Sequence, residues 1–310
     1  VPCEHLQNRR IQGVPYLTFD TPAPLTGGDL RLLSGLSFAY ALFSLKEREG
    51  EIWLRPIELL REDYVDSSMS SMLKYTGKTN ELFTRMMLNI AYASQPCREG
   101  IRLLDPVAGK GTTLYEGLIR GYDSYGIEIG EKVTLEAYHF IKRFLEHARY
   151  KFTVSTLKCS GPGKSFTALR HTFLLARTKE EKKAGQGKTM ELIAGDSRHA
   201  RAFFQPDFFH MIVGDLPYGI QHGNVTNEKQ SSFTRNPSEL VQRCLPAWKE
   251  VLRPGGVILL SWNSNVLSRE KLAAIFSQQG MRVLEEGAYC QLEHQVDQSI
   301  RRDILVAVKQ

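Results

Sequence analysis

The sequence contains few cysteines, no long apolar run and no strong excess of one charge. Its five cysteines are scattered without a CxxC pair, which argues against a disulfide framework and against a zinc site of the usual spacing. The eight histidines show no metal-binding spacing either, so no metal site is expected. The longest apolar runs, such as LSFAYALFSL, are far shorter than the roughly 20 residues that span a bilayer. No signal peptide opens the chain, and we therefore expect a cytoplasmic protein without a membrane partner.

The composition is that of a globular protein with a large core. The chain has 310 residues, of which 42% are hydrophobic and 10% aromatic, and this excludes a largely disordered protein. There are 40 lysines and arginines against 34 acidic residues, so the net charge is only +6. A charge of this size permits a polyanionic partner without requiring one.

Strand-like and helix-like segments alternate from Ile101 onward, which predicts an α/β protein with a doubly wound parallel sheet. The predicted strands are residues 101–105, 124–129, 189–196, 208–215, 257–263, 281–286 and 303–309. The predicted helices are residues 112–122, 132–150, 238–252 and 269–280, and the segment RPGG is expected to end the third of these.

Two other regions do not follow this alternation. Residues 151–188 are rich in lysine and arginine and are interpreted as an insertion. Before Ile101, residues 37–45 and 51–57 flank KEREGE as a predicted β-hairpin, and residues 79–93 carry helical periodicity. We therefore expect an N-terminal element at 1–72 and a catalytic domain at 73–310.

The segment LLDPVAGKGTT has the pattern of a ligand-binding turn. Asp105 ends a predicted strand, and Gly109 and Gly111 allow a ligand to approach the backbone of the turn that opens the next helix. Leu114 stands where a dinucleotide fingerprint has its third glycine, so structural turn glycines remain an alternative. Glu128 follows at about the interval at which an acidic side chain meets ribose hydroxyls. Since Asp105 would repel pyrophosphate, a cationic sulfonium nucleoside fits better than a dinucleotide.

The segment GPGKS, residues 161–165, resembles half of a phosphate-binding loop. The full pattern needs another glycine where Lys158 stands, and no clear strand precedes it. Nucleotide phosphate is therefore not expected to bind there.

A second strand end, in MIVGDLPYGIQHGN, displays Asp215. Apolar residues run to Val213, and then Gly214, Pro217 and Gly219 prevent regular structure. One interpretation is that Asp215 caps a turn that Pro217 shapes. The other is that the aspartate is presented to a substrate.

These segments together resemble a known enzyme family. DPVAGKGT, Glu128, AGDSRHA and DLPYG, in this order, are similar to class I S-adenosylmethionine (SAM)-dependent methyltransferases, and DLPYG is similar to their [DN]-P-P-Y signature. KYTGKTNELFTRMMLNIA resembles the segment that precedes the glycine turn in THUMP-associated tRNA guanosine-N2 methyltransferases. The resemblance implies a Rossmann-like, mostly parallel sheet with an antiparallel C-terminal strand. Two departures are Leu216 in place of a proline and an N-terminal region too short for a complete THUMP module.

The resemblance also implies roles for individual residues. Asp215 and the Leu216 carbonyl would accept the hydrogens of an exocyclic amine, Pro217 would shape the turn, and Tyr218 would stack on the base. The implied SAM-binding residues are Tyr75, Thr76 and Gly77 over the methionine tail; Asp105, Ala108, Gly109, Gly111 and Thr112 along the methionine; Glu128 and Ile129 at the ribose and adenine; and Asp196 and Ser197 at the adenine edge.

The expected function is therefore methylation of an exocyclic amine of a nucleic-acid base, with guanosine N2 in tRNA or another structured RNA as the first choice. The alternatives are adenine N6 or cytosine N4 in DNA, a protein glutamine, a non-catalytic binding partner with the same fold, and a nicotinamide oxidoreductase. The polar segment 221–236 is long enough to form a lid, and the lysines of the insertion are candidate nucleic-acid contacts. An accessory subunit would be one way to supply further RNA binding.

Overall fold

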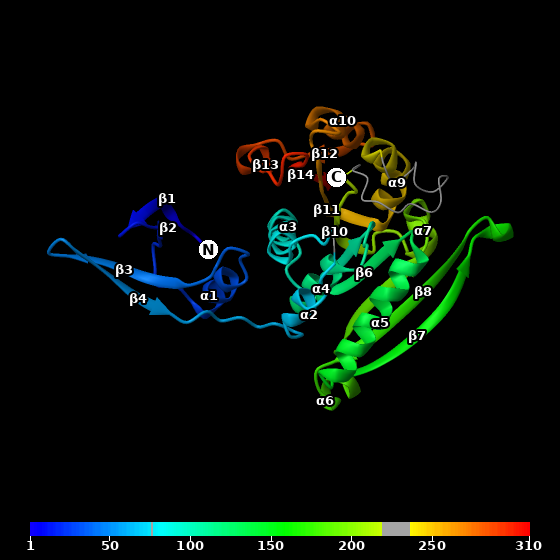
Figure 1. Cartoon of the computed structure of the whole chain (residues 1–310), viewed down its shortest axis with the longest axis horizontal. Coiled ribbons are helices and arrows are strands. Elements are labelled where there is room, and N and C mark those ends of the chain that lie inside the picture. The colour runs from blue at the N-terminus through cyan, green and yellow to red at the C-terminus, as the bar shows by residue number, and fades with distance from the viewer. Residues whose placement is uncertain (76, 219–235) are drawn as a thin grey trace. The chain divides into compact units, whose positions relative to one another are not determined.

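The computed structural model describes residues 1–75, 77–218 and 236–310, which form two compact units, Val1–Glu62 and Asp63–Gln310 (Figure 1). The sequence prediction placed a boundary ten residues later, between residues 72 and 73. The intervening segment belongs with the second unit because Tyr64, Val65 and Met69 are buried against the fourth helix of the chain.

The first unit consists of two hairpins and one helix. Strands β1 (Glu4–Ile11) and β2 (Val14–Asp20) form one antiparallel pair, which the sequence analysis did not predict. Strands β3 (Leu42–Arg48) and β4 (Glu51–Ile57) form the predicted hairpin around KEREGE. Between the hairpins, helix α1 (Gly27–Ser34) begins with a capping box in which Thr26 and Asp29 satisfy each other's backbone N–H groups.

The second unit contains one large sheet with the order β12-β14-β11-β10-β5-β6-β9-β8-β7, and β13 pairs with β14 beside this path. Strands β5, β6, β9, β10 and β11 are parallel, whereas β14 runs antiparallel to both β11 and β12. The expected Rossmann-like sheet with an antiparallel C-terminal strand is thus confirmed. The strands are β5 (Arg102–Asp105), β6 (Asp123–Glu128), β7 (Lys151–Ser160), β8 (Thr167–Ala176), β9 (Lys188–Ala194), β10 (Phe209–Asp215), β11 (Leu252–Asn263), β12 (Met281–Val283), β13 (His294–Gln295) and β14 (Arg301–Lys309).

Helices cover both faces of this sheet because the strands are apolar on both sides. On β5, for example, Leu103 and Leu104 are both fully buried but belong to clusters on opposite faces. One face packs against α2 (Ser68–Ser71), α3 (Glu81–Ala93), α4 (Thr112–Ile119) and α5 (Glu131–His147), and the other against α7 (Ala200–Phe203), α9 (Pro237–Val251) and α10 (Arg269–Gln278). Short helical segments are α6 (Lys179–Lys183), η1 (Pro162–Lys164), η2 (Ser197–His199) and η3 (Gly287–Cys290). No helix among the described residues is long and apolar enough to cross a membrane.

The insertion is a long hairpin that extends the sheet. Strands β7 and β8 pair over their whole length, and β8 pairs antiparallel with β9. Two antiparallel steps make β7 run in the direction of the parallel strands, so the hairpin tip at 161–166 lies beyond their carboxyl ends. Helix α6 follows β8 and lies at the opposite end of the hairpin (Figure 1).

Helix α9 ends at Val251, just before RPGG, as predicted. The following strand begins earlier than predicted, because β11 already includes RPGG. The register explains this, because Phe209 pairs with Leu252 and Met211 with Val257, so the extra residues of β11 form an irregularity in the ladder.

Candidate active site at the carboxyl edge of the sheet

The sequence-predicted acids lie at the carboxyl ends of neighbouring parallel strands. Asp105 ends β5, Glu128 ends β6 and Asp215 ends β10, while Asp196 follows β9 by two residues. Since β9, β6, β5 and β10 are adjacent in the sheet, these ends meet at one edge. Ligands of open α/β sheets bind in the crevice at this edge.

The glycine turn between β5 and α4 adopts a backbone that few other residues accept. Gly109 has φ of 51° and Gly111 has φ of 94°, both in the left-handed region. The buried Ala108 donates its N–H to the Ile127 carbonyl at 2.9 Å and accepts from the Gly111 N–H at 2.8 Å, and α4 then begins at Thr112. The turn is thus fixed against β6 by its own backbone.

Glycines of the core also let α4 approach the sheet. A Cβ on Gly117 would lie 2.6 Å from Leu103, and one on Gly126 would lie 2.7 Å from Leu114. In a dinucleotide fingerprint the third glycine allows close packing of the helix on the strand. Leu114 stands at that position here, and Gly117 and Gly126 allow the close packing instead.

Glu128 links the glycine turn to the loop after β6. Its Oε2 accepts the Gly109 N–H at 2.9 Å and its Oε1 accepts the Gly130 N–H at 2.8 Å. Burial raises the pKa of Glu128, and the backbone donors counteract that rise. Each oxygen keeps a lone pair for a further donor, such as a ribose hydroxyl. Ile129, the next residue, has an exposed fraction of 42%, so its apolar side chain is available to a ligand.

Asp105 is the most perturbed acid of this edge. Only 3% of the residue is exposed, and its Oδ1 accepts the Val107 N–H at 3.0 Å. Burial raises the pKa of Asp105 to about 7, and the negative charges of Asp215 and Glu128 add to the rise. The three carboxylates therefore form a concentration of negative charge that would attract a cationic ligand.

Asp196 and Ser197 follow β9 but lie in different environments. Asp196 is the N-cap of η2, and Arg198 binds its carboxylate through an ion pair at 2.6 Å. Burial alone would raise the pKa of Asp196, but the hydrogen bonds and charge of Arg198 lower it. The hydroxyl of Ser197 is buried and accepts the indole N–H of Trp248 at 2.8 Å, so it faces the core.

The segment before α3 lies against this edge. The Lys110 ammonium lies 4.6 Å from the ring centroid of Tyr75, and burial raises the pKa of Tyr75. Gly77 is exposed, with φ of 80°. Thr79 reaches further and donates its hydroxyl to Asp215 Oδ2 at 2.6 Å. Thr76 lies outside the described residues.

A buried ion pair holds this segment in place. Glu116 of α4 is fully buried and accepts from Arg85 of α3 at 2.9 Å and from the Ser70 hydroxyl of α2 at 2.6 Å. Lys78 bridges the same elements, since it donates to the Ser70 carbonyl at 2.6 Å and pairs with Glu81 at 3.2 Å. Helices α2, α3 and α4 therefore fix both ends of the segment that approaches Asp215.

The predicted catalytic stretch is ordered by contacts on both oxygens of Asp215. Tyr218 donates its hydroxyl to Oδ1 at 2.6 Å, opposite the bond from Thr79 to Oδ2. Leu216 is buried and donates its N–H to the Ser261 carbonyl of β11 at 2.8 Å, whereas Pro217 is half-buried. The ring of Tyr218 also lies 5.2 Å from the guanidinium of Arg302.

Sequence reasoning missed three residues of this region, namely Thr79, Lys110 and Arg302. Thr79 and Lys110 stand inside quoted motifs, so their positions carried a signal, but their partners are distant along the chain. Arg302 is the second residue of the C-terminal strand β14 and carries no motif.

Three other predictions from the sequence concern the GPGKS segment, the proposed lid and the absence of a metal site. The GPGKS segment forms the tip of the β7–β8 hairpin, between two strands and away from any strand-to-helix turn that binds phosphate. Residues 221–235 of the proposed lid lie outside the described residues. Among the residues that the structure describes, no group of histidine, cysteine and acidic side chains could hold a metal ion.

No protein-family model and no curated protein sequence matches the chain. Among solved structures, TrmN from Thermus thermophilus is similar over 87% of this chain and 60% of its own, with 17% identity and a TM-score of 0.43. TehB from Haemophilus influenzae is similar over 72% of this chain and 61% of its own, with 14% identity and a TM-score of 0.38. Magnesium protoporphyrin IX methyltransferase (ChlM) from Synechocystis PCC 6803, described with bound SAM, is similar over 76% of this chain and 87% of its own, with 12% identity and a TM-score of 0.40. The chain thus spans about three fifths of the TrmN and TehB chains.

Proposed function

We propose that this protein transfers the methyl group of SAM to an exocyclic amine of a nucleic-acid base, with guanosine N2 in tRNA or another structured RNA as the favoured acceptor. The observation that carries the proposal is the position of Asp215. Its carboxylate ends the strand next to the glycine turn, and the Thr79 and Tyr218 hydroxyls fix the orientation of its two oxygens. A fixed acceptor beside a nucleoside-binding turn suits the positioning of an amine.

The residues of the edge fit SAM as the methyl donor. Burial raises the pKa of Asp105, repulsion by Asp215 and Glu128 adds to the rise, and a ligand that carries an ammonium and a sulfonium would relieve that repulsion. Glu128, which accepts the Gly109 N–H, would accept from ribose hydroxyls as well, and the exposed Ile129 would contact adenine. Bound SAM would supply the electrophilic methyl group. The same charges disfavour the pyrophosphate of a nicotinamide dinucleotide.

Asp215 would act by positioning the amine. The lone pair of an exocyclic amine is delocalised into the ring, so the nitrogen becomes nucleophilic only as it pyramidalises. A carboxylate that accepts an amine hydrogen favours this change and stabilises the positive charge that develops on nitrogen. An ionised carboxylate has about four lone-pair sites, and Thr79 and Tyr218 use one on each oxygen, so acceptor capacity remains for the amine.

The decisive experiment is labelled methyl transfer from SAM to total RNA, total DNA and protein, followed by mass spectrometry of the nucleosides and amino acids. We expect N2-methylguanosine from RNA. Label in N6-methyladenine, N4-methylcytosine or methylglutamine would keep the methyltransferase assignment and replace the acceptor. No label in any fraction, despite SAM binding, would favour a non-catalytic binding partner that needs another subunit.

Asp215 provides the residue-level test. Asp215→Ala is expected to lower turnover about 100- to 1000-fold, by analogy with the removal of one positioned hydrogen-bonding group, and to leave SAM affinity within about twofold. Asp215→Asn should lose less, because its amide oxygen still accepts. Equal loss of SAM binding and of folding in both variants would make Asp215 a structural residue and contradict the assignment.

A further inference from the structure

Arg302 is a buried arginine to which the described part of the chain supplies no anionic partner. Only 8% of the residue is exposed, and its Nε has no hydrogen-bond partner. Within residues 1–75, 77–218 and 236–310, its guanidinium makes ring contacts alone. The guanidinium carbon lies 4.1 Å from the ring centroid of Phe83 and 5.2 Å from that of Tyr218.

The alternation of β14 explains why this side chain is buried. Ile304 and Val306 point to the face that α3 covers, where they pack in one cluster with residues of α3. Arg302 is two residues before Ile304 and therefore lies on the same face. It pairs in register with Asn263 of β11 and reaches the first turn of α3, where Phe83 lies.

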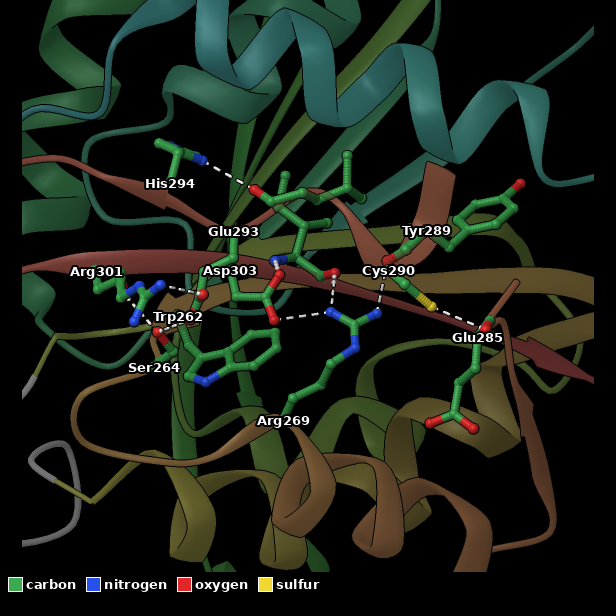
Figure 2. Close-up of polar contacts among 12 residues, drawn as sticks. Trp262, Ser264, Arg269, Glu285, Tyr289, Cys290, Glu293, His294, Arg301 and Asp303 are labelled. Atoms are coloured by element: carbon green, nitrogen blue, oxygen red, sulfur yellow. Dashed lines mark hydrogen bonds and ion pairs between the residues drawn. The ribbon is translucent and has the colours of Figure 1, made fainter. Parts of the chain in front are cut away.

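The charged residues on either side of Arg302, Arg301 and Asp303, each pair with a residue of opposite charge (Figure 2). Arg301 pairs with Glu293 at 2.9 Å, and Ser264 donates its hydroxyl to the other oxygen of that carboxylate at 2.7 Å. Asp303 accepts from Arg269 at 2.8 Å. These bonds fix the start of β14 and with it the backbone position of Arg302, for which the described residues supply no ion pair.

A buried charge that lacks an anion is unfavourable, and cation–π contacts offset only part of that penalty. A ligand that accepts from the guanidinium would offset the rest. The ligand here would lie beside Asp215, because Tyr218 touches both residues: its ring faces Arg302 and its hydroxyl binds Asp215. The strand order β14-β11-β10-β5 puts Arg302 on the far side of Asp215 from the glycine turn, which is the acceptor's side.

We propose that Arg302 binds the acceptor base beside Asp215, and this rests on the function proposed above. Its guanidinium donates to a ring nitrogen of the base while Asp215 accepts from the neighbouring amine. Guanine presents N3 beside its N2 amine, and adenine and cytosine present equivalent nitrogens. A guanidinium next to a carboxylate is complementary to such an acceptor–donor edge. The contacts with the rings of Phe83 and Tyr218 restrict the position of the planar guanidinium.

The test compares Arg302→Met and Arg302→Lys with wild type in methyl transfer from SAM to total tRNA. Met keeps the volume and removes the charge, while Lys keeps the charge and removes the planar fork. We expect KM for tRNA to rise about 10- to 100-fold in Arg302→Met, which is the loss of one charge-assisted hydrogen bond, with SAM affinity within about twofold. Arg302→Lys should retain part of the affinity. Arg301→Met is the matched control, because Arg301 is the adjacent arginine, exposed and paired with Glu293, and its KM should change less than threefold.

Thermal melting separates this role from a structural one. Since the described part of the chain supplies no anion to the buried Arg302, Arg302→Met should melt at the same temperature as wild type or higher. A lower melting temperature together with weaker SAM binding would show that Arg302 supports the fold, and the inference would be wrong. An unchanged KM would also overturn it.

An altered acceptor gives the sharpest result. An RNA whose target base has a carbon in place of the ring nitrogen should lose about 10- to 100-fold in kcat/KM with wild type and less than threefold with Arg302→Met. If Asp215→Ala abolishes transfer while Arg302→Met and the altered base have no effect, the proposed function stands and only the role of Arg302 fails. Absence of transfer by wild type would overturn both.

Discussion

Asp105→Asn should stabilise the ligand-free protein at alkaline pH. The carboxyl group is buried, and its pKa rises from 3.8 to about 7. The folded state therefore prefers the protonated form, and the stability that this preference contributes is fully present below about pH 4 and is lost as pH rises through 7. At pH 8 the loss in the free energy of unfolding amounts to about 4 kcal/mol. Asn keeps the oxygen that accepts from Val107 but cannot ionise.

The assay is thermal melting of both proteins, without ligand, at pH 8 and pH 5. For a unit of this size, 4 kcal/mol corresponds to an increase in melting temperature on the order of 10 °C at pH 8. At pH 5, Asp105 is mostly protonated in the folded state but mostly ionised in the unfolded chain, so the difference should fall to about 1.7 kcal/mol, or on the order of 4 °C. Asp207→Asn is the control, because Asp207 is exposed and its ion pair with Lys309 is worth about 1 kcal/mol or less. Equal melting temperatures of wild type and Asp105→Asn at pH 8 would refute the argument that ionisation of the buried Asp105 destabilises the folded state.

The same residue should make SAM binding depend on pH. The ammonium of SAM would stabilise the ionised Asp105, so binding requires loss of its proton below pH 7. Calorimetry of the wild type should show an affinity that falls up to tenfold for each pH unit below 7, with a proton released on binding. Asp105→Asn should bind SAM more weakly at pH 8 and without this pH dependence. A steep dependence that persists in the variant would assign the proton to another group.

Two further predictions concern the cofactor edge and the hairpin. Glu128→Ala should lower SAM affinity about 10- to 100-fold in calorimetry, because it removes the acceptor for ribose and for two backbone N–H groups; unchanged affinity would contradict the cofactor assignment. Lys158 and Lys164 lie near the hairpin tip on the side of the site, and reversing both charges should reduce the slope of log affinity for tRNA against log salt by about one to two. Reversal of Lys182 and Lys183 of α6, at the opposite end of the hairpin, should leave that slope unchanged. Equal effects of both pairs would exclude a specific contact at the tip.

Local patterns in the sequence were sufficient for the core of the fold. Continuous apolar runs mark the buried parallel strands, and an acid after such a run marks the carboxyl edge. The sequence alone therefore assigns Asp105, Glu128 and Asp215 to one edge, and the structure brings them together there. The prediction needs only the direction of each strand, which short connections between strand and helix fix.

The hairpin insertion could not be predicted in the same way, because its charges suggested a surface. Arg170 pairs with Glu191 of β9 at 3.4 Å, and Arg177 lies 4.8 Å from the ring centroid of Tyr64. These two arginines attach the hairpin to the sheet and to the segment before α2. A basic composition states the charge of a segment but not whether each cation is paired, and the pairing partners here come from distant parts of the chain.

The proposed acceptor side of the site shows why motifs describe only half of it. The SAM contacts proposed for the glycine turn lie within one strand–turn–helix unit, β5 to α4, so they leave a short pattern such as DPVAGKGT. Thr79 and Asp215 touch across 136 residues, and Arg302 reaches Tyr218 from the last strand. A proposed acceptor surface that is assembled from three separate segments has no fixed residue spacing that a motif could capture. Its residues are recognised only in the structure, as charged or hydroxyl side chains whose position the local fold does not explain. If Arg302→Met raises KM for tRNA without loss of stability, a buried charge that has no ion pair among the described residues is a sufficient guide to such a surface; if it does not, the aromatic contacts around Arg302 are part of the core.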